Sequence, residues 1–214
     1  MVLTVSRDYI ELPPGSTVTL TYQTWEDYEA LLAIRNENAA TKIRFNGHTQ
    51  QIKLVSPGAG YSNRACSLAA LVKSLLRHQG RDWDSSHPIT LQRLQEAGAE
   101  PDACFYIANW QAAIGKERID LSVDPPPDLA IEVDITSLTD LEIYQILAIP
   151  EVWGYRQGQL SIYVLTANGY EDRSNSPTFP TVDVKNLLPE YVERAWSAGS
   201  SVALREFEQV LNSD

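Results

Sequence analysis

Residues 127–134 read PDLAIEVD, and this segment decides the fold that we expect for the chain. Its apolar run has the length of a buried strand, but Glu132 occupies a position where an interior strand favours another apolar side chain. Residues 100–107, EPDACFYI, form a second such run with Asp102 at its head. Because a buried carboxylate is costly without a partner, two carboxylates at one end of a strand pair favour a hard divalent cation between them.

The expected pairing of the two strands selects which acids meet. If the strands run antiparallel, Asp102 at the start of the first lies opposite Glu132 near the end of the second. Asp128 then lies roughly 13 Å away, at about 3.3 Å per residue. We therefore predict that Asp102 and Glu132 converge while Asp128 points elsewhere. The alternative is a pair of buried acids bound by backbone amides or arginine.

An acid after proline at the head of one strand, and a glutamate on the next, resemble the PD-(D/E)XK core of restriction-endonuclease-like nucleases. More specifically, the chain resembles a family of predicted restriction endonucleases that is abundant in cyanobacteria. The segments that carry this resemblance are GAEPD at 98–102, KERIDL at 116–121, DPPPDLAIEVDIT at 124–136 and IPEVW at 149–153. The resemblance implies an α/β fold, a restriction-endonuclease-like mixed β-sheet flanked by helices. Its core would be α-β-β-β-α-β, with added N-terminal and C-terminal helices.

The resemblance also implies a chemistry, the hydrolysis of DNA phosphodiester bonds with Mg²⁺, for which Mn²⁺ can substitute. Asp102 and Glu132 would be the metal ligands, and waters that the metal retains would supply the nucleophile. In such nucleases a lysine two residues beyond the glutamate orients that water, but this chain has Asp134 there. Asp134 is then either an auxiliary ligand or a group that contacts the ligands, and the catalytic cation must come from elsewhere, with Lys53 as the first candidate.

Periodicity and turn residues predict the remaining elements. We expect helices at 25–36, opened by a capping box at Thr24 and Asp27, at 65–76 before Gly80, at 138–148, and over 184–211 with a break near Gly199. We expect strands at 42–45 and 51–55 around Asn46-Gly47, then at 88–94, 103–107, 129–135, 151–156, 160–165 and 170–171. All 214 residues are predicted to form one domain with a core at 50–166, to which both ends are additions.

Charge opposes DNA binding, since 28 acidic residues against 17 basic ones give a net charge of −11. A local positive stripe could still bind a phosphate backbone, so DNA is disfavoured as a partner without being excluded. The chain has no apolar run of membrane-spanning length, and Met1–Arg7 lacks the apolar core of a signal peptide. We therefore expect a cytoplasmic protein with no membrane partner. Cys66 and Cys104 are expected to be buried small hydrophobic residues rather than a disulfide or a metal pair.

Three functions agree with these residues. The first is a Mg²⁺-dependent DNA endonuclease, weak or degenerate because its lysine is missing, and a homodimer if it cuts both strands. The second is a catalytically inactive nuclease fold that serves as a binding or assembly module. The third is metal-dependent hydrolysis of a small phosphorylated metabolite, which suits an acidic surface. The position of the nearest lysine or arginine relative to Asp102 and Glu132 separates the first function from the second.

Overall fold

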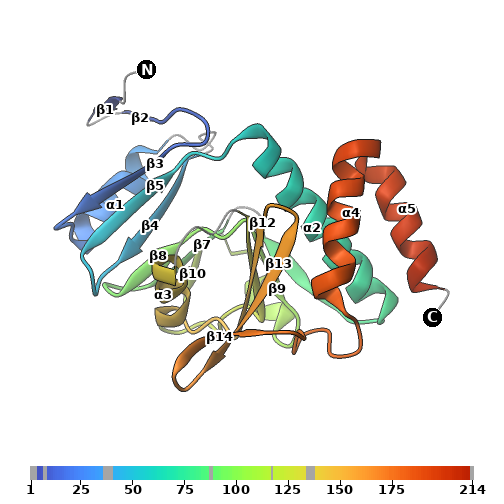
Figure 1. Ribbon diagram of the computed structural model, residues 1–214. Helices are drawn as coiled ribbons and strands as arrows, with labels where there is room; N and C mark the ends of the chain where they lie inside the picture. The colour runs from blue at the N-terminus through green and yellow to red at the C-terminus, as the bar shows by residue number, and fades with distance from the viewer. Residues whose placement is uncertain are drawn as a thin grey trace.

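The computed structural model describes residues 4–6, 9–35, 41–86, 89–116, 118–133 and 138–212. Within these residues, two six-stranded sheets of mixed direction lie side by side (Figure 1). Three apolar clusters of buried side chains fill the space between the sheets and beneath the helices.

One sheet contains the two strands that carry the acidic residues. Its strands are β6 (Asp84–Ser86), β9 (Ala103–Tyr106), β11 (Leu129–Val133), β12 (Glu151–Arg156), β13 (Gln159–Thr166) and β14 (Gly169–Arg173), in the spatial order β14-β13-β12-β11-β9-β6. β11 and β12 are parallel and are connected through α3 (Leu138–Ile146), whereas the other neighbours are antiparallel. With α2 (Ala59–His78) before β6, the order α2-β6-β9-β11-α3-β12 is the α-β-β-β-α-β core that the resemblance implies.

The other sheet brings the N-terminal part of the chain into the body of the protein. Its strands are β3 (Thr17–Thr21), β4 (Lys42–Asn46), β5 (Gln51–Val55), β7 (Thr90–Arg93), β8 (Ala97–Ala99) and β10 (Arg118–Asp120), in the order β10-β7-β8-β4-β5-β3. A separate hairpin joins β1 (Thr4–Ser6) to β2 (Tyr9–Glu11). Two strands from before residue 50, β3 and β4, are thus integral strands of this second sheet, while the elements of the nuclease-like core all lie within residues 50–166.

The sequence pattern predicts the wrong segment as the first strand of the nuclease-like core. The predicted strand at 88–94 exists as β7, but it joins the sheet that contains β4. The core position next to β9 belongs to β6, whose sequence Asp-Ser-Ser has neither alternation nor β-branched residues. Pairing of Asp84 with Tyr106 and Ser86 with Cys104 determines its place, so the tertiary context makes this strand.

The helices follow the predicted patterns. α1 (Trp25–Ile34) begins with the expected capping box, in which Asp27 N–H donates to Thr24 Oγ1 at 3.3 Å and Thr24 N–H donates to Asp27 Oδ2 at 2.8 Å. α2 ends before Gly80, whose φ of 63° is one that glycine adopts readily. The C-terminal helices α4 (Val184–Ala198) and α5 (Ser200–Leu211) are separated at Gly199 and lie beside α2 (Figure 1).

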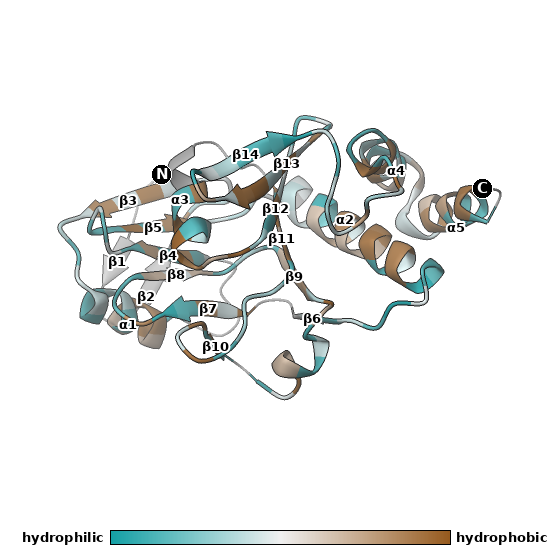
Figure 2. Ribbon diagram, turned by 90° about the horizontal axis from the view of Figure 1, so that it is seen from below, coloured by the Kyte–Doolittle hydropathy of each residue, from teal (hydrophilic) through white to brown (hydrophobic). Residues whose placement is uncertain are grey.

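The packing of these helices follows from their amphipathic sequences. α2, α4 and α5 each carry hydrophobic and hydrophilic residues (Figure 2), and their buried side chains share one apolar cluster with β11 and β12. A short 3₁₀ helix, η1 (Trp110–Ala113), follows β9. None of the described helices is long and apolar enough to cross a membrane.

The two cysteines differ in environment. Cys104 is buried in β9, as expected, but Cys66 is exposed on α2, so its predicted burial is wrong. Both are free thiols.

Candidate active site

Asp102 and Glu132 lie at the same end of the β9–β11 pair. The antiparallel ladder reaches Ala103 opposite Ile131, and the next position along places Asp102 beside Glu132. The Asp102 N–H donates to the Ile131 carbonyl at 3.0 Å, and the Val133 N–H donates to Asp102 Oδ2 at 2.8 Å. The antiparallel register that the sequence predicts is therefore confirmed.

Asp128 occupies the opposite end of β11, also as predicted. Its Oδ2 accepts the N–H groups of Ile107 and Ala108 at 2.7 and 3.0 Å. These bonds fix the chain where it leaves β9. Asp128 is thus a structural acid outside the candidate site.

Two cations from β4 reach the acidic pair. Lys42 Nζ contacts Asp102 Oδ1 and lies 3.6 Å from Glu132 Oε2, while Arg44 Nη2 lies 2.8 Å from Glu132 Oε1. The four side chains have little exposure to solvent, with exposed fractions of 12% for Lys42, 5% for Arg44 and Asp102, and 0% for Glu132. When all four are ionised their charges cancel, which is the condition for burying carboxylates at tolerable cost.

The alternation of β4 delivers both cations to one face. Ile43 and Phe45 point into the apolar cluster beneath α1, where Phe45 stacks on Tyr28 with ring centroids 5.6 Å apart. Because successive side chains of a strand point to opposite faces, Lys42 and Arg44 point away from that cluster. Their side chains therefore meet Asp102 and Glu132 on the neighbouring sheet.

Two tyrosines donate further hydrogen bonds to the carboxylates. Tyr61 of α2 donates its hydroxyl to Asp102 Oδ2 at 2.6 Å, and Tyr144 of α3 donates its hydroxyl to Glu132 Oε1. Burial, and after it the charge of Glu132, raises the pKa of both phenols far above the usual value. Both hydroxyls thus remain protonated donors, which hold the two carboxylates in place.

Glu132 itself has a shifted pKa. Burial raises the pKa of its carboxyl from 4.5 to about 7, and the charge of Asp102 acts in the same direction. Arg44, Lys42 and the Tyr144 hydroxyl lower it, but they do not offset the loss of water around a fully buried group. A shift of this kind is typical of functional sites and also of buried structural acids.

A third buried acid, Glu100, lies on the other side of β4 and has a structural role. It forms an ion pair with Arg35 and accepts the Ile43 N–H at 3.2 Å and the Thr90 hydroxyl at 3.0 Å. These bonds tie α1, β4 and β7 together. Glu100 thereby fixes the strand that carries Lys42.

The predicted site residues have different outcomes. Asp102 and Glu132 are brought together, Asp134 lies outside the described residues, and Lys53 lies in the wall of a cavity beside the pair. Among the described residues, Lys42 and Arg44 form ion pairs with these two acids, and the role predicted for Lys53 stays a prediction. The spacing of Lys42 and Arg44 around Ile43 could have indicated a shared face, but no pattern in the sequence places that face against β11.

The acidic pair offers oxygen ligands for a hard cation, although no cluster of three His, Cys, Asp or Glu side chains forms among the described residues. Glu132 Oε2 is buried and accepts no hydrogen bond from the described residues. Lys42 Nζ lies 3.6 Å from this oxygen, beyond hydrogen-bonding distance. The donors therefore fit Mg²⁺ or Mn²⁺ through Glu132 Oε2 and Asp102 Oδ1, provided that the flexible Lys42 side chain moves aside.

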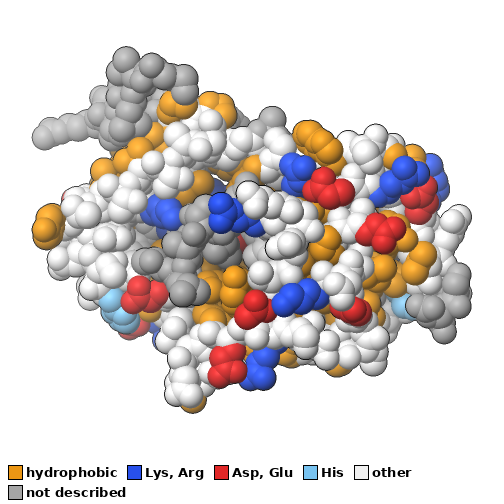
Figure 3. Space-filling view, viewed as in Figure 1, with side chains coloured by type: hydrophobic (Ala, Val, Ile, Leu, Met, Phe, Trp, Pro, Cys, Tyr) orange, Lys and Arg blue, Asp and Glu red, His pale blue; other side chains and the backbone are white. Residues whose placement is uncertain are grey.

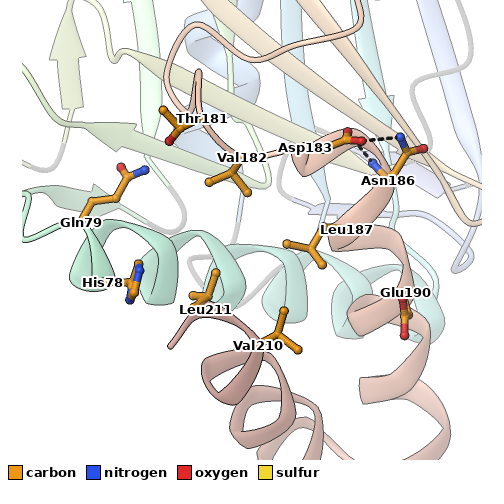
Figure 4. Close-up of a pocket in the computed structure, with 10 residues that line it drawn as sticks. All are labelled: His78, Gln79, Thr181, Val182, Asp183, Asn186, Leu187, Glu190, Val210 and Leu211. Carbon is orange, nitrogen blue, oxygen red and sulfur yellow. Dashed lines mark hydrogen bonds between the residues drawn. The ribbon is translucent and has the colours of Figure 1, made fainter. Parts of the chain in front are cut away.

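A cavity of about 450 Å³ adjoins the pair and is lined in part by Arg44, Tyr61 and Val133. Lys and Arg side chains are visible in this part of the surface, between the strands of the β4 sheet and β12 (Figure 3). A larger cavity of about 670 Å³ lies between α2, α4 and α5, where His78, Val182 and Leu211 point toward one another (Figure 4). It shares no described lining residue with the acidic pair, so we assign it no part in the site.

The order of elements and the paired acids define the restriction-endonuclease-like class of proteins. The crystal structure of a protein described as a putative nuclease from Anabaena variabilis has the same fold, with a TM-score of 0.53 and 16% sequence identity. The match covers 79% of this chain and 98% of that one. No curated protein sequence shows significant similarity to the chain.

The family follows from the sequence itself. Residues 25–197 match the family model described as "Uma2: Putative restriction endonuclease". Because this match spans more than half of the chain, the protein belongs to the Uma2 family. The matched region includes all four charged residues of the site, Lys42, Arg44, Asp102 and Glu132.

Proposed function

We propose that the protein is a Mg²⁺-dependent DNA endonuclease in which Lys42 takes the role of the lysine that Asp134 replaces. The observation that carries this proposal is the position of Lys42 Nζ, in contact with Asp102 and 3.6 Å from Glu132. An ammonium group is thus present beside the acidic pair, but it comes from β4 rather than from β11.

Each residue of the candidate site has a separate role in this proposal. Asp102 and Glu132 would hold the metal, which supplies an activated water and offsets charge on the phosphate. Tyr61, Tyr144 and Arg44 keep the two carboxylates oriented through the hydrogen bonds and the ion pair described above. Lys42, once displaced from Asp102, orients the attacking water and stabilises the charge that develops on the phosphate oxygens.

A nicking assay on supercoiled plasmid with Mn²⁺ tests the proposal. Lys42→Met should lower the rate by roughly 10²- to 10⁴-fold, the scale of one lost acid–base or electrostatic contributor. Glu132→Ala should abolish nicking. Lys73→Gln, on α2 and outside the described lining of the cavity, is the control and should nick like the wild type. Unchanged nicking in Glu132→Ala would show that a contaminant is responsible, and unchanged nicking in Lys42→Met would remove Lys42 from the mechanism.

A second function has its own observation in its favour. The charges of Lys42 and Arg44 balance those of Asp102 and Glu132 without a metal, which is what a catalytically inactive binding module would need. Such a module should show no Mn²⁺-dependent nicking at any protein concentration. Its carboxylates should also be indifferent to divalent cations.

A further inference from the structure

A second cavity lies next to the one beside the acidic pair, and we call it the α4 cavity. It has a volume of about 450 Å³ and lies between the start of α2, α4 and the turn that connects β12 to β13. Tyr61 and Gln157 line both cavities, so the two are adjacent. Because Tyr61 also donates to Asp102, the α4 cavity begins one side chain away from the candidate active site. The other described residues that line it are Arg64, Tyr155, Gly158 and Glu193.

The charges at the wall of the α4 cavity balance each other. Arg64 and Glu193 are the charged groups among its described lining residues, and Arg64 Nε and Nη2 donate to the two Glu193 oxygens at 2.9 and 3.2 Å. The Tyr155 hydroxyl donates to Glu193 Oε1 at 2.8 Å. The hydrogen bond from Arg64 lowers the pKa of the Glu193 carboxyl, so both partners are charged at neutral pH. A wall with balanced charges suits an uncharged polar ligand better than a free anion.

Flat side chains at the α4 cavity offer surfaces for stacking. Tyr61 contributes a half-buried phenol ring, and the guanidinium of Arg64 is itself planar. Trp196 extends these surfaces, because its ring centroid lies 4.9 Å from Arg64 Cζ and it follows Glu193 by one turn of α4. Unpaired nucleic-acid bases stack on aromatic rings and on arginine guanidinium groups.

Trp196 is exposed over 53% of its surface, whereas the other four tryptophans are buried or half-buried. A Cβ atom placed on Gly60 would lie 3.7 Å from Trp196 Cη2, so the indole lies against the first turn of α2. The ring is thus supported by α2 and Arg64 while much of its surface faces solvent. A single exposed apolar residue needs no explanation, but this one stands at the edge of a cavity beside the candidate active site.

From these observations we infer that the α4 cavity binds an unpaired base of a DNA strand whose phosphate enters the candidate active site. This inference rests on the proposed endonuclease function and gives it a substrate class, single-stranded DNA. Glu193 presents acceptor oxygens, and Gln157 presents an acceptor and a donor, for the edge of the base. The volume of about 450 Å³ suits one small planar group.

The net charge of −11 also favours a single strand over a duplex. A duplex has one negative charge per about 1.7 Å of its axis, against about 3.4 Å for one of its strands. Long-range attraction gives an acidic protein little affinity for either, so contacts that do not depend on charge must supply it. One base stacked on an aromatic side chain supplies roughly 5- to 150-fold in affinity.

Fluorescence anisotropy on the full chain in EDTA tests binding without turnover. The probes are a short end-labelled oligo(dT) strand, a strand of the same length with abasic sugars throughout, and the oligo(dT) strand paired with oligo(dA). We expect the single strand with bases to bind most tightly. Trp196→Ala should weaken its binding by roughly 5- to 150-fold without affecting the abasic strand, whereas Trp196→Phe should retain most of the affinity. Tyr22→Ala removes an exposed aromatic residue outside the described lining of both cavities and should bind like the wild type.

Tryptophan fluorescence gives a second measurement that a structural role of Trp196 would not explain. A base stacked on an indole quenches its emission, so unlabelled oligo(dT) should quench the wild type but not Trp196→Phe. Three results would each overturn the inference: equal binding of the abasic and base-containing strands, tighter binding of the duplex, or no binding of any probe. Wild-type affinity for oligo(dT) in Trp196→Ala would overturn it as well.

The absence of metal separates this inference from the endonuclease proposal. Binding that depends on the bases, in a protein that does not nick DNA with Mn²⁺, would support the α4 cavity as a base site and contradict the proposed activity. Nicking without any dependence of binding on the bases would contradict the base site and leave the activity supported.

Discussion

Glu132 is the residue on which the candidate site depends. Its side chain is completely buried, yet it takes part in ion pairs with Arg44 at 2.8 Å and Lys42 at 3.6 Å. Truncating one partner of a buried pair leaves the other charge without compensation, and this commonly costs about 3 to 5 kcal/mol. Stability and activity must therefore be measured separately for every variant of these residues.

The shifted pKa of Glu132 predicts a pH dependence of the metal-free protein. Its pKa is about 7 in the folded state and 4.5 in the ordinary, water-exposed state. Between these values the folded protein holds a proton that the unfolded chain has released, so the free energy of unfolding falls as the pH rises. At pH values above 7, the contribution of Glu132 to the free energy of unfolding is lower by roughly 3 kcal/mol than at low pH.

The Glu132→Gln variant should lack this part of the pH dependence of the free energy of unfolding. Denaturant unfolding in EDTA, at pH values on either side of the 4.5 to 7 window, measures the difference between the wild type and Glu132→Gln. We expect the wild type to lose stability relative to the variant as the pH rises. A constant difference across the window would show that the two β4 cations hold the Glu132 pKa near its ordinary value.

At the scale of elements, β4 is the part of the fold that makes the site. Its hydrophobic residues pack beneath α1, and its charged residues Lys42 and Arg44 point to the opposite face. Its pairing with β8 places it beside the sheet that contains β9 and β11. The alternation of β4 and its hairpin with β5 were predictable from residues 42–55. Its pairing with β8 was not, because Phe45 and Gly98 are far apart in sequence and β8 has only the pattern Ala-Gly-Ala.

Gly98 shows how closely β8 and α1 approach each other. A Cβ atom at this position would overlap the phenol ring and the hydroxyl of the fully buried Tyr28. Gly98→Ala should therefore force Tyr28 to move and should lower the free energy of unfolding by about 1 to 3 kcal/mol. It should also lower any Mn²⁺-dependent nicking, because β4 would shift. Denaturant unfolding that agrees with the wild type within about 0.5 kcal/mol would contradict this packing.

At the scale of the whole molecule, the sequence predicts the acidic half of the site better than the basic half. Asp102 and Glu132 are local features of two strands that pair directly, so strand register alone brings them together. Lys42 and Arg44 reach them from a different sheet, through contacts that no short segment encodes. The net charge of −11 likewise does not indicate that Arg44, Lys53 and Arg156 line the same cavity.

The proposed mechanism requires Asp102 and Glu132 to bind a divalent cation in competition with Lys42. Calorimetric titration of the protein with Mn²⁺, at a pH above the Glu132 pKa of about 7, tests it directly. We expect the wild type to bind Mn²⁺, Glu132→Ala to lose that binding, and Lys42→Met to bind more tightly because the competing ammonium is gone. Absence of Mn²⁺ binding in both the wild type and Lys42→Met would contradict the claim and would make the acidic pair structural.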